Sequence, residues 1–285
     1  MQSWDTTPIS LEVRLAFTRA AVQVIGRRAD ARLLHIKGST VEGRLRGAVR
    51  GSTDVDVLID PSAVDRMHWE LLRSGWRVYS TFVEGSPFEH AQTYFHPEWG
   101  YLDLHRRFPG IRIPDQDAFE LLWTGRGEHV TAGITCAVPS ADVQGVLLTL
   151  NAARDPERRS DATTLWAQQT PEERARRTEL VRRLRAEVAV AAALGDLDRY
   201  RGRPEYLLWK TVSQGGGRVA EWWGRIRAAP TIAAAIRTAA RAPLVNRSSL
   251  EHELGRPPGR RDIAVAYLRR IRTASRDLLG RRGQP

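Results

Sequence analysis

Apolar residues recur at helical spacing near the start of the chain and then change to a strand-like pattern. The first recurrence predicts a helix over residues 10–26, with apolar positions at Leu11, Leu15, Ala16, Val22 and Ile25. Residues 32–36 form a short apolar run that predicts a strand. Three small residues, 38–40, predict a turn after this strand, and a second helix is expected to continue through Leu45.

Residues 53–60 alternate strictly, which predicts a strand with two different faces. One face carries Val55, Val57 and Ile59, and the other carries Asp54, Asp56 and Leu58. Pro61 ends the strand, and Ser62 is expected to cap a helix that runs to about residue 74. Further strands are predicted over residues 76–82, 93–95 and 101–105.

This alternation of strands and helices predicts an α+β (α/β-like) domain with a mixed sheet over residues 1–137. From residue 138 the pattern becomes helical, beginning with a helix capped by Ser140. Thr170-Pro171-Glu172-Glu173 is a strong helix start, with a capping threonine, proline at the first position and glutamate at the third. Later helices are predicted over residues 204–214, 219–228, 232–240 and 261–279, so a mostly helical domain is expected over residues 138–285.

Composition places the chain among globular proteins, with 285 residues of which 42% are hydrophobic. Charged residues interrupt every apolar run well before the roughly 18 residues that a membrane-spanning helix needs. Residues 1–10 contain Asp5 and no basic residue before an apolar stretch, unlike a secretory signal. We therefore expect no membrane association and a cytoplasmic location, with the single cysteine, Cys136, as a small buried side chain.

The net charge of +11 is concentrated in the second half of the chain. Residues 1–135 hold 16 Lys and Arg against 17 Asp and Glu, whereas residues 136–285 hold 28 against 16, a net +12. This excess favours an acidic partner such as RNA, a nucleotide or an anionic small molecule. Arginine-rich helices also form solvated faces without a ligand, and the sequence leaves both interpretations open.

The residues that point to chemistry lie around the alternating strand. Residues two apart on a strand point the same way, so Asp54 and Asp56 project side by side and need a cation between them. Carboxylate oxygens at this spacing suit Mg²⁺ bound together with substrate phosphates. Gly38 and Ser39, in the turn before this strand, would allow backbone and hydroxyl donors to approach the phosphates of a nucleotide.

In these residues the chain resembles the DNA polymerase β-like nucleotidyltransferase superfamily. The resembling positions are Gly38 and Ser39, then Asp54 and Asp56 on one strand, then Asp103 on a later strand. Within the superfamily the chain is most similar to a bacterial group of uncharacterised nucleotidyltransferases. The positions that match this group are Lys37-Gly38, Arg50 and Asp103-Leu104-His105.

The resemblance implies a magnesium-dependent enzyme that moves a nucleoside monophosphate from an NTP, ATP or another, to an acceptor and releases pyrophosphate. Two Mg²⁺ ions, which Mn²⁺ could replace, would be held by Asp54, Asp56 and Asp103. Lys37, Gly38, Ser39 and Arg50 would bind the nucleotide, and His105 would contact either the acceptor or a phosphate. The sequence leaves open three structural alternatives, namely a solvated Lys37, an Arg50 ion pair that holds the start of the strand, and a structural hydrogen bond of His105. The arginine-rich helical domain would line the cleft for acceptor and nucleotide.

The acceptor is not defined by these residues. A small molecule, such as an antibiotic, a sugar or a natural-product intermediate, is the first expectation, and tRNA or another RNA is the second because of the basic half. A protein side chain is the third. A different class of function stays open as well, namely a regulatory module that binds a nucleotide without turnover.

Overall fold

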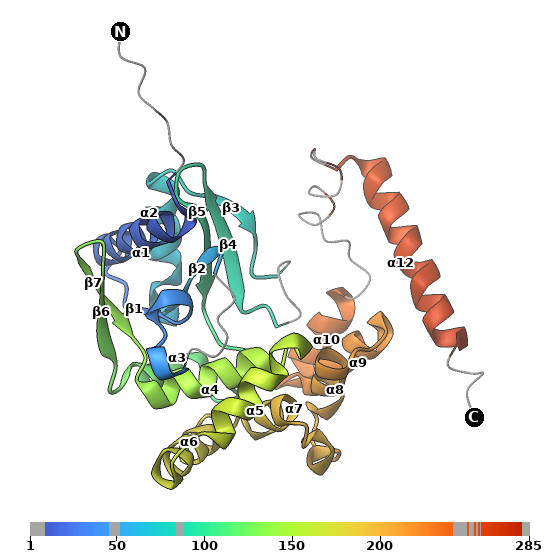
Figure 1. The fold of residues 1–285 in the computed structure, drawn as a ribbon. Helices are drawn as coiled ribbons and strands as arrows, with labels where there is room; N and C mark the ends of the chain where they lie inside the picture. Colours follow the sequence, from blue (N-terminus) through green and yellow to red (C-terminus); the bar gives the residue numbers. More distant parts are fainter. Residues whose placement is uncertain are drawn as a thin grey trace. The chain divides into compact units, whose positions relative to one another are not determined.

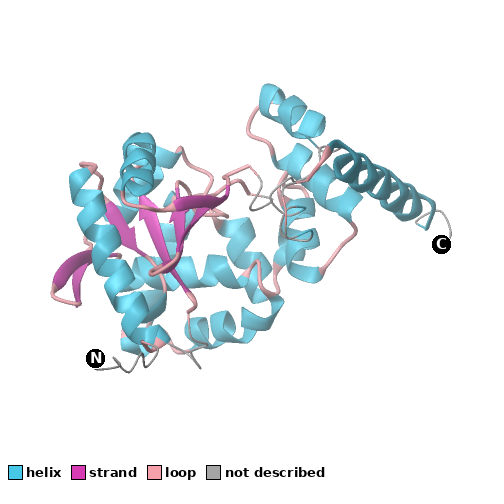
Figure 2. Ribbon diagram, turned by 90° about the horizontal axis from the view of Figure 1, so that it is seen from above, coloured by secondary structure: helices cyan, strands magenta, loops and turns pink. Residues whose placement is uncertain are grey.

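The computed structural model describes residues 9–45, 52–83, 88–241, 250, 254, 256 and 258–280. The chain forms two compact units. The first comprises Met1–Phe108 and Ile113–Gln144, and the second comprises Pro109–Arg112 and Gly145–Pro285. Figure 1 traces the elements along the chain, and Figure 2 shows its strands gathered together while the C-terminal part of the ribbon consists of helices and loops.

The first unit is built around a five-stranded sheet with the strand order β1-β2-β5-β4-β3. Its central pair, β2 and β5, is parallel, while the pairs β1–β2, β4–β5 and β3–β4 are antiparallel. The strand bounds are β1 Leu33–His35, β2 Asp54–Ile59, β3 Arg77–Ser80, β4 Ala91–His96 and β5 Gly100–His105. The prediction of an α+β fold with a mixed sheet is confirmed, and each predicted strand is present within a few residues of its expected bounds.

One face of this sheet is buried by two helices, α1 (Leu11–Arg28) and α2 (Val64–Arg73). The alternation predicted for β2 holds, because Val55, Val57 and Ile59 all lie in this core. Side chains from the other elements complete it, among them Leu15, Val22, Ile25, Met67, Leu71, Trp76, Tyr94, Leu102 and Leu104. The polar residues of β2 and β5 consequently point to the opposite face, since neighbours along a strand alternate.

The connection after β1 differs from the predicted helix. It contains two short 3₁₀ helices, η1 (Gly38–Thr40) and η2 (Gly43–Leu45). Val41 between them is extended, with ψ 135°, which stops the helical turn. The β-branched residues Thr40 and Val41 and the flexible Gly43 disfavour a continuous α-helix here.

The start of α2 also differs in detail from the prediction. The N-cap of α2 is Ala63, without a side-chain hydrogen bond, and Ser62 does not cap this helix. Asp60 instead caps the 3₁₀ turn before it, because its Oδ1 accepts hydrogen bonds from the Ser62 backbone N–H at 3.0 Å and from the Ser62 hydroxyl at 2.8 Å. A single 3₁₀ turn, η3 (Pro61–Ala63), then leads into the α-helix. A carboxylate in this position also favours the helix N-terminus electrostatically.

Three elements of the first unit have no counterpart in the prediction. Helix α3 covers Asp115–Trp123, and strands β6 (Gly127–Thr131) and β7 (Ile134–Val138) form a separate antiparallel hairpin. Its turn has positive φ at Ala132 (45°) and Gly133 (77°), the geometry that two-residue hairpin turns favour. The sequence signal was present as β-branched residues on both sides of an Ala-Gly pair.

All regular secondary structure in the described residues of the second unit is helical, as predicted. It contains most of α4 (Ala141–Ala152), followed by α5 (Arg159–Ala167), α6 (Pro171–Arg183), α7 (Glu187–Leu194), α8 (Tyr206–Gln214), α9 (Arg218–Ala228), α10 (Ile232–Arg241) and α12 (Arg260–Gly280). The predicted capping box at the start of α6 is confirmed, with reciprocal hydrogen bonds between Thr170 and Glu173. Helices α5 and α7 were not individually predicted.

Gly224 lets α8 and α9 approach closely, and its replacement by alanine is expected to destabilise the second unit. An added Cβ would lie 2.7 Å from the Leu208 backbone N and Cα, which cannot move without shifting α8. We expect the free energy of unfolding to fall by about 1–3 kcal/mol, the usual cost of overpacking. Thermal or urea unfolding measures this change. Gly202→Ala, where no atom lies within 4 Å of an added Cβ, is the matched control, and equal stability of the two variants would contradict the prediction.

Two observations bear on the expectations from composition. Cys136 is fully buried, as predicted, and burial raises the pKa of its thiol to about 11. In the part of the chain that the structure describes, every helix is too short or too polar to span a bilayer.

Candidate active site

The parallel register of β2 and β5 brings the predicted aspartates together. Asp54 lies opposite Tyr101, Asp56 opposite Asp103, and Leu58 opposite His105. Each pair points to the sheet face away from α1 and α2, so the acidic groups of two neighbouring strands share one surface. We refer to Asp54, Asp56 and Asp103 as the carboxylate cluster.

Asp56 is the most buried member of the carboxylate cluster, at 5% exposure. Its Oδ1 accepts hydrogen bonds from Lys37 Nζ at 2.5 Å and from His105 Nε2 at 2.8 Å. Because a carboxylate only accepts, His105 must carry its proton on Nε2. His105 is itself 1% exposed, so it is held beneath the carboxylate cluster.

The other two carboxylates are held by hydroxyl groups. Asp103 Oδ1 accepts a hydrogen bond from Thr93 Oγ1 on β4 at 2.6 Å, and Asp54 Oδ1 accepts one from Ser52 at 3.1 Å. Ligand atoms of Asp56, Asp103 and His105 all lie within 4.8 Å of one another. The described residues thus include a compact donor group of the size that one cation could occupy.

The electrostatics of the carboxylate cluster reflect crowded negative charge. Burial raises the pKa of the Asp54 carboxyl, and the neighbouring Asp56 and Asp103 raise it further. Burial also acts to raise the pKa of Asp56, yet Lys37 and His105 outweigh it and hold this pKa well below its usual range. Burial lowers the pKa of His105 and outweighs the hydrogen bond to Asp56, which acts to raise it.

The residues present fit a bound divalent cation. Three carboxyl groups face one ammonium group, that of Lys37, which leaves excess negative charge on a partly buried surface. Hard oxygen donors of this kind are the ligands that Mg²⁺ prefers, usually together with substrate phosphates. The imidazole of His105 orients Asp56, a role that buried groups behind metal ligands commonly have.

The turn after β1 lies beside the carboxylate cluster. Gly38 adopts φ +68°, and an added Cβ would lie 2.6 Å from Arg19 Nη2 and 3.4 Å from the Ser52 Cβ. Only glycine adopts this backbone conformation without strain and leaves room for the Arg19 guanidinium. Ser39, the next residue, is exposed.

Replacing Gly38 by alanine is expected to distort this turn. The positive φ alone costs about 1–2 kcal/mol for an L-residue, and the new methyl group would displace Arg19. If the turn positions phosphates, we expect the rate of pyrophosphate release from NTP to fall about 100-fold, because small misplacements near reacting groups are costly. Gly43→Ala is the control in the same connection, since no atom lies within 4 Å of its added Cβ. Equal rates for the two variants would contradict a role of the turn.

The remaining predicted site residues are accounted for as follows. Arg50 lies outside the described residues. Lys37 contacts Asp56, whereas a contact with nucleotide phosphate stays a prediction. His105 contacts Asp56 as well, and its predicted contact with acceptor or phosphate also stays a prediction. Sequence reasoning missed Ser52, Thr93 and Arg19, whose contacts depend on the register of the sheet and on the packing of α1.

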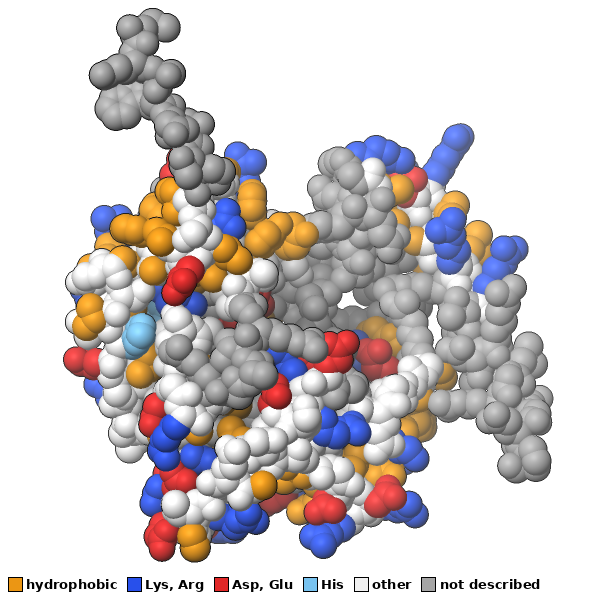
Figure 3. Space-filling model, in the orientation of Figure 1, with side chains coloured by type: hydrophobic (Ala, Val, Ile, Leu, Met, Phe, Trp, Pro, Cys, Tyr) orange, Lys and Arg blue, Asp and Glu red, His pale blue; other side chains and the backbone are white. Residues whose placement is uncertain are grey.

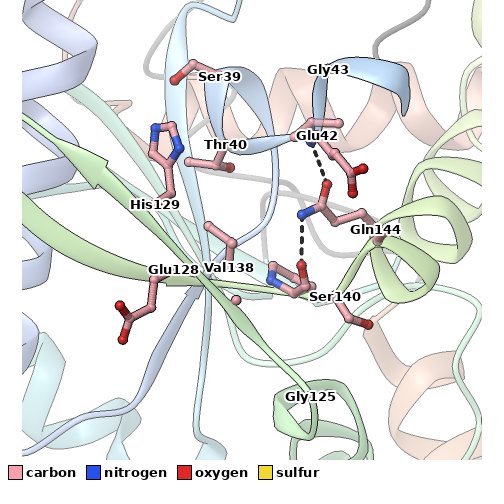
Figure 4. Close-up of a pocket in the computed structure, with 14 residues that line it drawn as sticks. Ser39, Thr40, Glu42, Gly43, Gly125, Glu128, His129, Val138, Ser140 and Gln144 are labelled. Atoms are coloured by element: carbon pink, nitrogen blue, oxygen red, sulfur yellow. Dashed lines mark hydrogen bonds between the residues drawn. The ribbon is translucent and has the colours of Figure 1, made fainter.

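A separate cavity of about 520 Å³ adjoins the turn (Figure 4). Its lining comes from η1 and η2, from the β6–β7 hairpin and from the start of α4. Gln144 fixes one wall, because its Oε1 accepts from the Glu42 backbone N–H and its Nε2 donates to the Pro139 carbonyl, both at 2.8 Å. Ser39 lines this cavity, but no member of the carboxylate cluster does. The acidic chemistry therefore belongs to the sheet face and not to this cavity.

Comparisons with known proteins give a distant structural likeness. No protein-family model and no curated protein matches the chain. A solution structure of the antibiotic-resistance factor ANT(2'')-Ia is similar to it, with a TM-score of 0.37 and 14% sequence identity. The similarity covers 67% of this chain and 94% of that chain.

Proposed function

We propose that this protein is a magnesium-dependent nucleotidyltransferase that transfers a nucleoside monophosphate from an NTP to a small-molecule acceptor and releases pyrophosphate. The observation that carries the proposal is the carboxylate cluster, which two parallel strands bring together beside the glycine-serine turn. Phosphoryl transfer of this kind depends mainly on positioning and charge neutralisation, which such an arrangement can supply.

Each part of the site has a distinct task in this proposal. The backbone and the exposed hydroxyl group of Gly38-Ser39 bind the terminal phosphates. Asp54, Asp56 and Asp103 hold Mg²⁺, which when bound neutralises the triphosphate and polarises the attacking hydroxyl group. His105 and Thr93 fix the orientation of Asp56 and Asp103 through their hydrogen bonds. Lys37 limits the repulsion within the carboxylate cluster.

Pyrophosphate release tests the proposal directly. The purified protein is incubated with each of the four NTPs and a small-molecule extract of cells, with Mg²⁺ or with excess EDTA. We expect release with at least one NTP, only when Mg²⁺ and extract are both present. Absence of release with all four NTPs, although the protein is folded and the extract is varied, would refute the enzyme assignment. Mg²⁺-independent binding of NTP without release would instead support a regulatory module.

The basic charge of the second half favours RNA as the second candidate acceptor. Residues 136–285 carry the net +12, and counterion release makes RNA binding strongly dependent on salt. Filter retention of labelled RNA, combined with a steep loss of activity between 50 and 200 mM salt, would favour this candidate. Weak salt dependence would favour a small acceptor.

A further inference from the structure

Three aromatic side chains extend the face of the sheet that carries the carboxylate cluster. Tyr101 lies two residues before Asp103 on β5 and opposite Asp54 on β2. Phe95 on β4 lies opposite Tyr101, and their ring centroids are 5.0 Å apart. The ring of Tyr79, from β3, lies 5.1 Å from that of Tyr101. We call Tyr79, Phe95 and Tyr101 the aromatic platform.

The rings of the aromatic platform are partly exposed. Tyr79 is 38% and Tyr101 37% exposed, and Phe95 is half-buried. The rings are inclined to each other, at 77° for Tyr79–Tyr101 and 47° for Phe95–Tyr101, so they leave part of their apolar surface uncovered. Figure 3 shows hydrophobic side chains gathered on the first unit where Figure 1 places α1, β3 and β5. Exposed apolar area that adjoins polar functional groups is typical of a binding site.

The strand order decides which reactant the aromatic platform faces. The glycine-serine turn follows β1, on one side of β2, whereas β5, β4 and β3 follow on the other side. Attack on the α-phosphorus proceeds in line with the leaving group. If pyrophosphate leaves toward the turn, as the proposed function requires, the attacking hydroxyl group must enter from the β5 side. The aromatic platform lies on that side.

Resting on the proposed function, we infer that the acceptor is a hydroxyl compound with a flat aromatic ring, which stacks on the aromatic platform. Its hydroxyl oxygen forms the new bond to the α-phosphorus as the bond to the β-phosphate oxygen breaks. Pyrophosphate takes the bonding electron pair, and the hydroxyl proton passes to water. Neighbouring strands lie about 4.8 Å apart. If the ring of the acceptor stacks on Tyr101, a hydroxyl group attached a few bonds from that ring would therefore lie near Asp54 and Asp103.

Saturation-transfer NMR on the full chain tests ring binding without requiring turnover. The probes are phenyl β-D-glucoside and methyl β-D-glucoside, which share a sugar and differ in the flat ring. We expect saturation of the phenyl protons and none of the methyl compound. Tyr101→Ala should weaken phenyl glucoside binding about ten-fold, because it removes the aromatic face on which the phenyl ring stacks.

Two controls separate stacking from a merely structural role of Tyr101. Tyr101→Phe keeps the ring and should bind the phenyl probe like the wild type. Trp69→Ala removes another exposed ring, 59% exposed on α2, and should have no effect. With an NTP and Mg²⁺, Tyr101→Ala should raise KM for phenyl glucoside about ten-fold, with kcat and the Kd for Mg²⁺–NTP little changed.

The remaining outcomes overturn the inference in distinguishable ways. If saturation of the phenyl protons is absent, or is unchanged in Tyr101→Ala, the aromatic platform is not a ring-binding site. Pyrophosphate release from NTP with cell extract would then still support the proposed function. A ten-fold loss of Mg²⁺–NTP affinity in Tyr101→Ala would show that the rings hold the nucleobase and not the acceptor. Phenyl binding that depends on Tyr101, with no pyrophosphate release from any NTP, would overturn the acceptor role together with the proposed function.

Discussion

Replacement of Asp56 by asparagine is expected to lower the rate of nucleotide transfer about 1,000-fold or more. Asparagine has the same shape and can still accept hydrogen bonds from Lys37 and His105, so the backbone of β2 should be unchanged. The substitution removes the negative charge that holds a divalent cation, whose effect on phosphoryl transfer amounts to several kcal/mol. Since each 1.36 kcal/mol corresponds to a ten-fold change in rate, about 4 kcal/mol gives this loss.

Steady-state pyrophosphate release, with circular dichroism to confirm folding, measures the effect of Asp56→Asn. Asp65→Asn is the matched control, because Asp65 is an exposed residue in the first turn of α2 and takes no part in the carboxylate cluster. We expect Asp65→Asn to retain the wild-type rate. A folded Asp56→Asn protein with more than a tenth of wild-type activity would contradict the assignment of Asp56 as a cation ligand.

The sequence predicts the parts of the carboxylate cluster because strand periodicity is a local property. Alternation alone placed Asp54 and Asp56 on the polar face of β2, and the structure confirms that Val55 and Val57 lie in the core. The parallel pairing of β2 with β5, which sets Asp56 opposite Asp103, joins segments far apart in the chain. Only the resemblance, and not the pattern, indicated that these two strands are neighbours.

The contacts that tune the carboxylate cluster depend on tertiary packing and could not be predicted in this way. The sequence left open whether His105 contacts a substrate or makes a structural hydrogen bond, and the structure shows a buried hydrogen bond from His105 to Asp56. Thr93 reaches Asp103 because β4 pairs with β5 in one particular register. The sequence around Arg19 predicts a helix and does not single out this residue. Its position beside Gly38 follows only from how α1 packs on the sheet. Periodicity assigns a side chain to a face and does not identify its partner.

His35 makes the stability of the first unit sensitive to acid. It lies on β1 with 1% exposure, and its Nε2 donates to the Gln23 Oε1 at 3.1 Å. Burial, together with the charges of Arg19 and His129, lowers its pKa to about 3. Between pH 6.5 and 3 the unfolded chain binds a proton at this histidine that the folded chain does not, so the stability present above pH 6.5 is lost as the pH falls.

The lowered pKa of His35 corresponds to about 4–5 kcal/mol of folding free energy in total. This stability is lost at up to about 1.4 kcal/mol per pH unit as the pH falls. His35→Gln keeps a donor for Gln23 and cannot titrate, so we expect its free energy of unfolding to fall much less than that of the wild type between these pH values. Urea unfolding at a series of pH values measures both curves, and His96→Gln, at a half-buried position on β4, should retain the wild-type dependence. Parallel curves for wild type and His35→Gln would contradict the prediction. Acidic groups also titrate in this range. At Asp60, burial acts to raise the pKa, but hydrogen bonds from Arg32 and Ser62 outweigh it and lower the pKa to about 2. Such groups contribute equally to both curves, so the difference between the curves isolates His35.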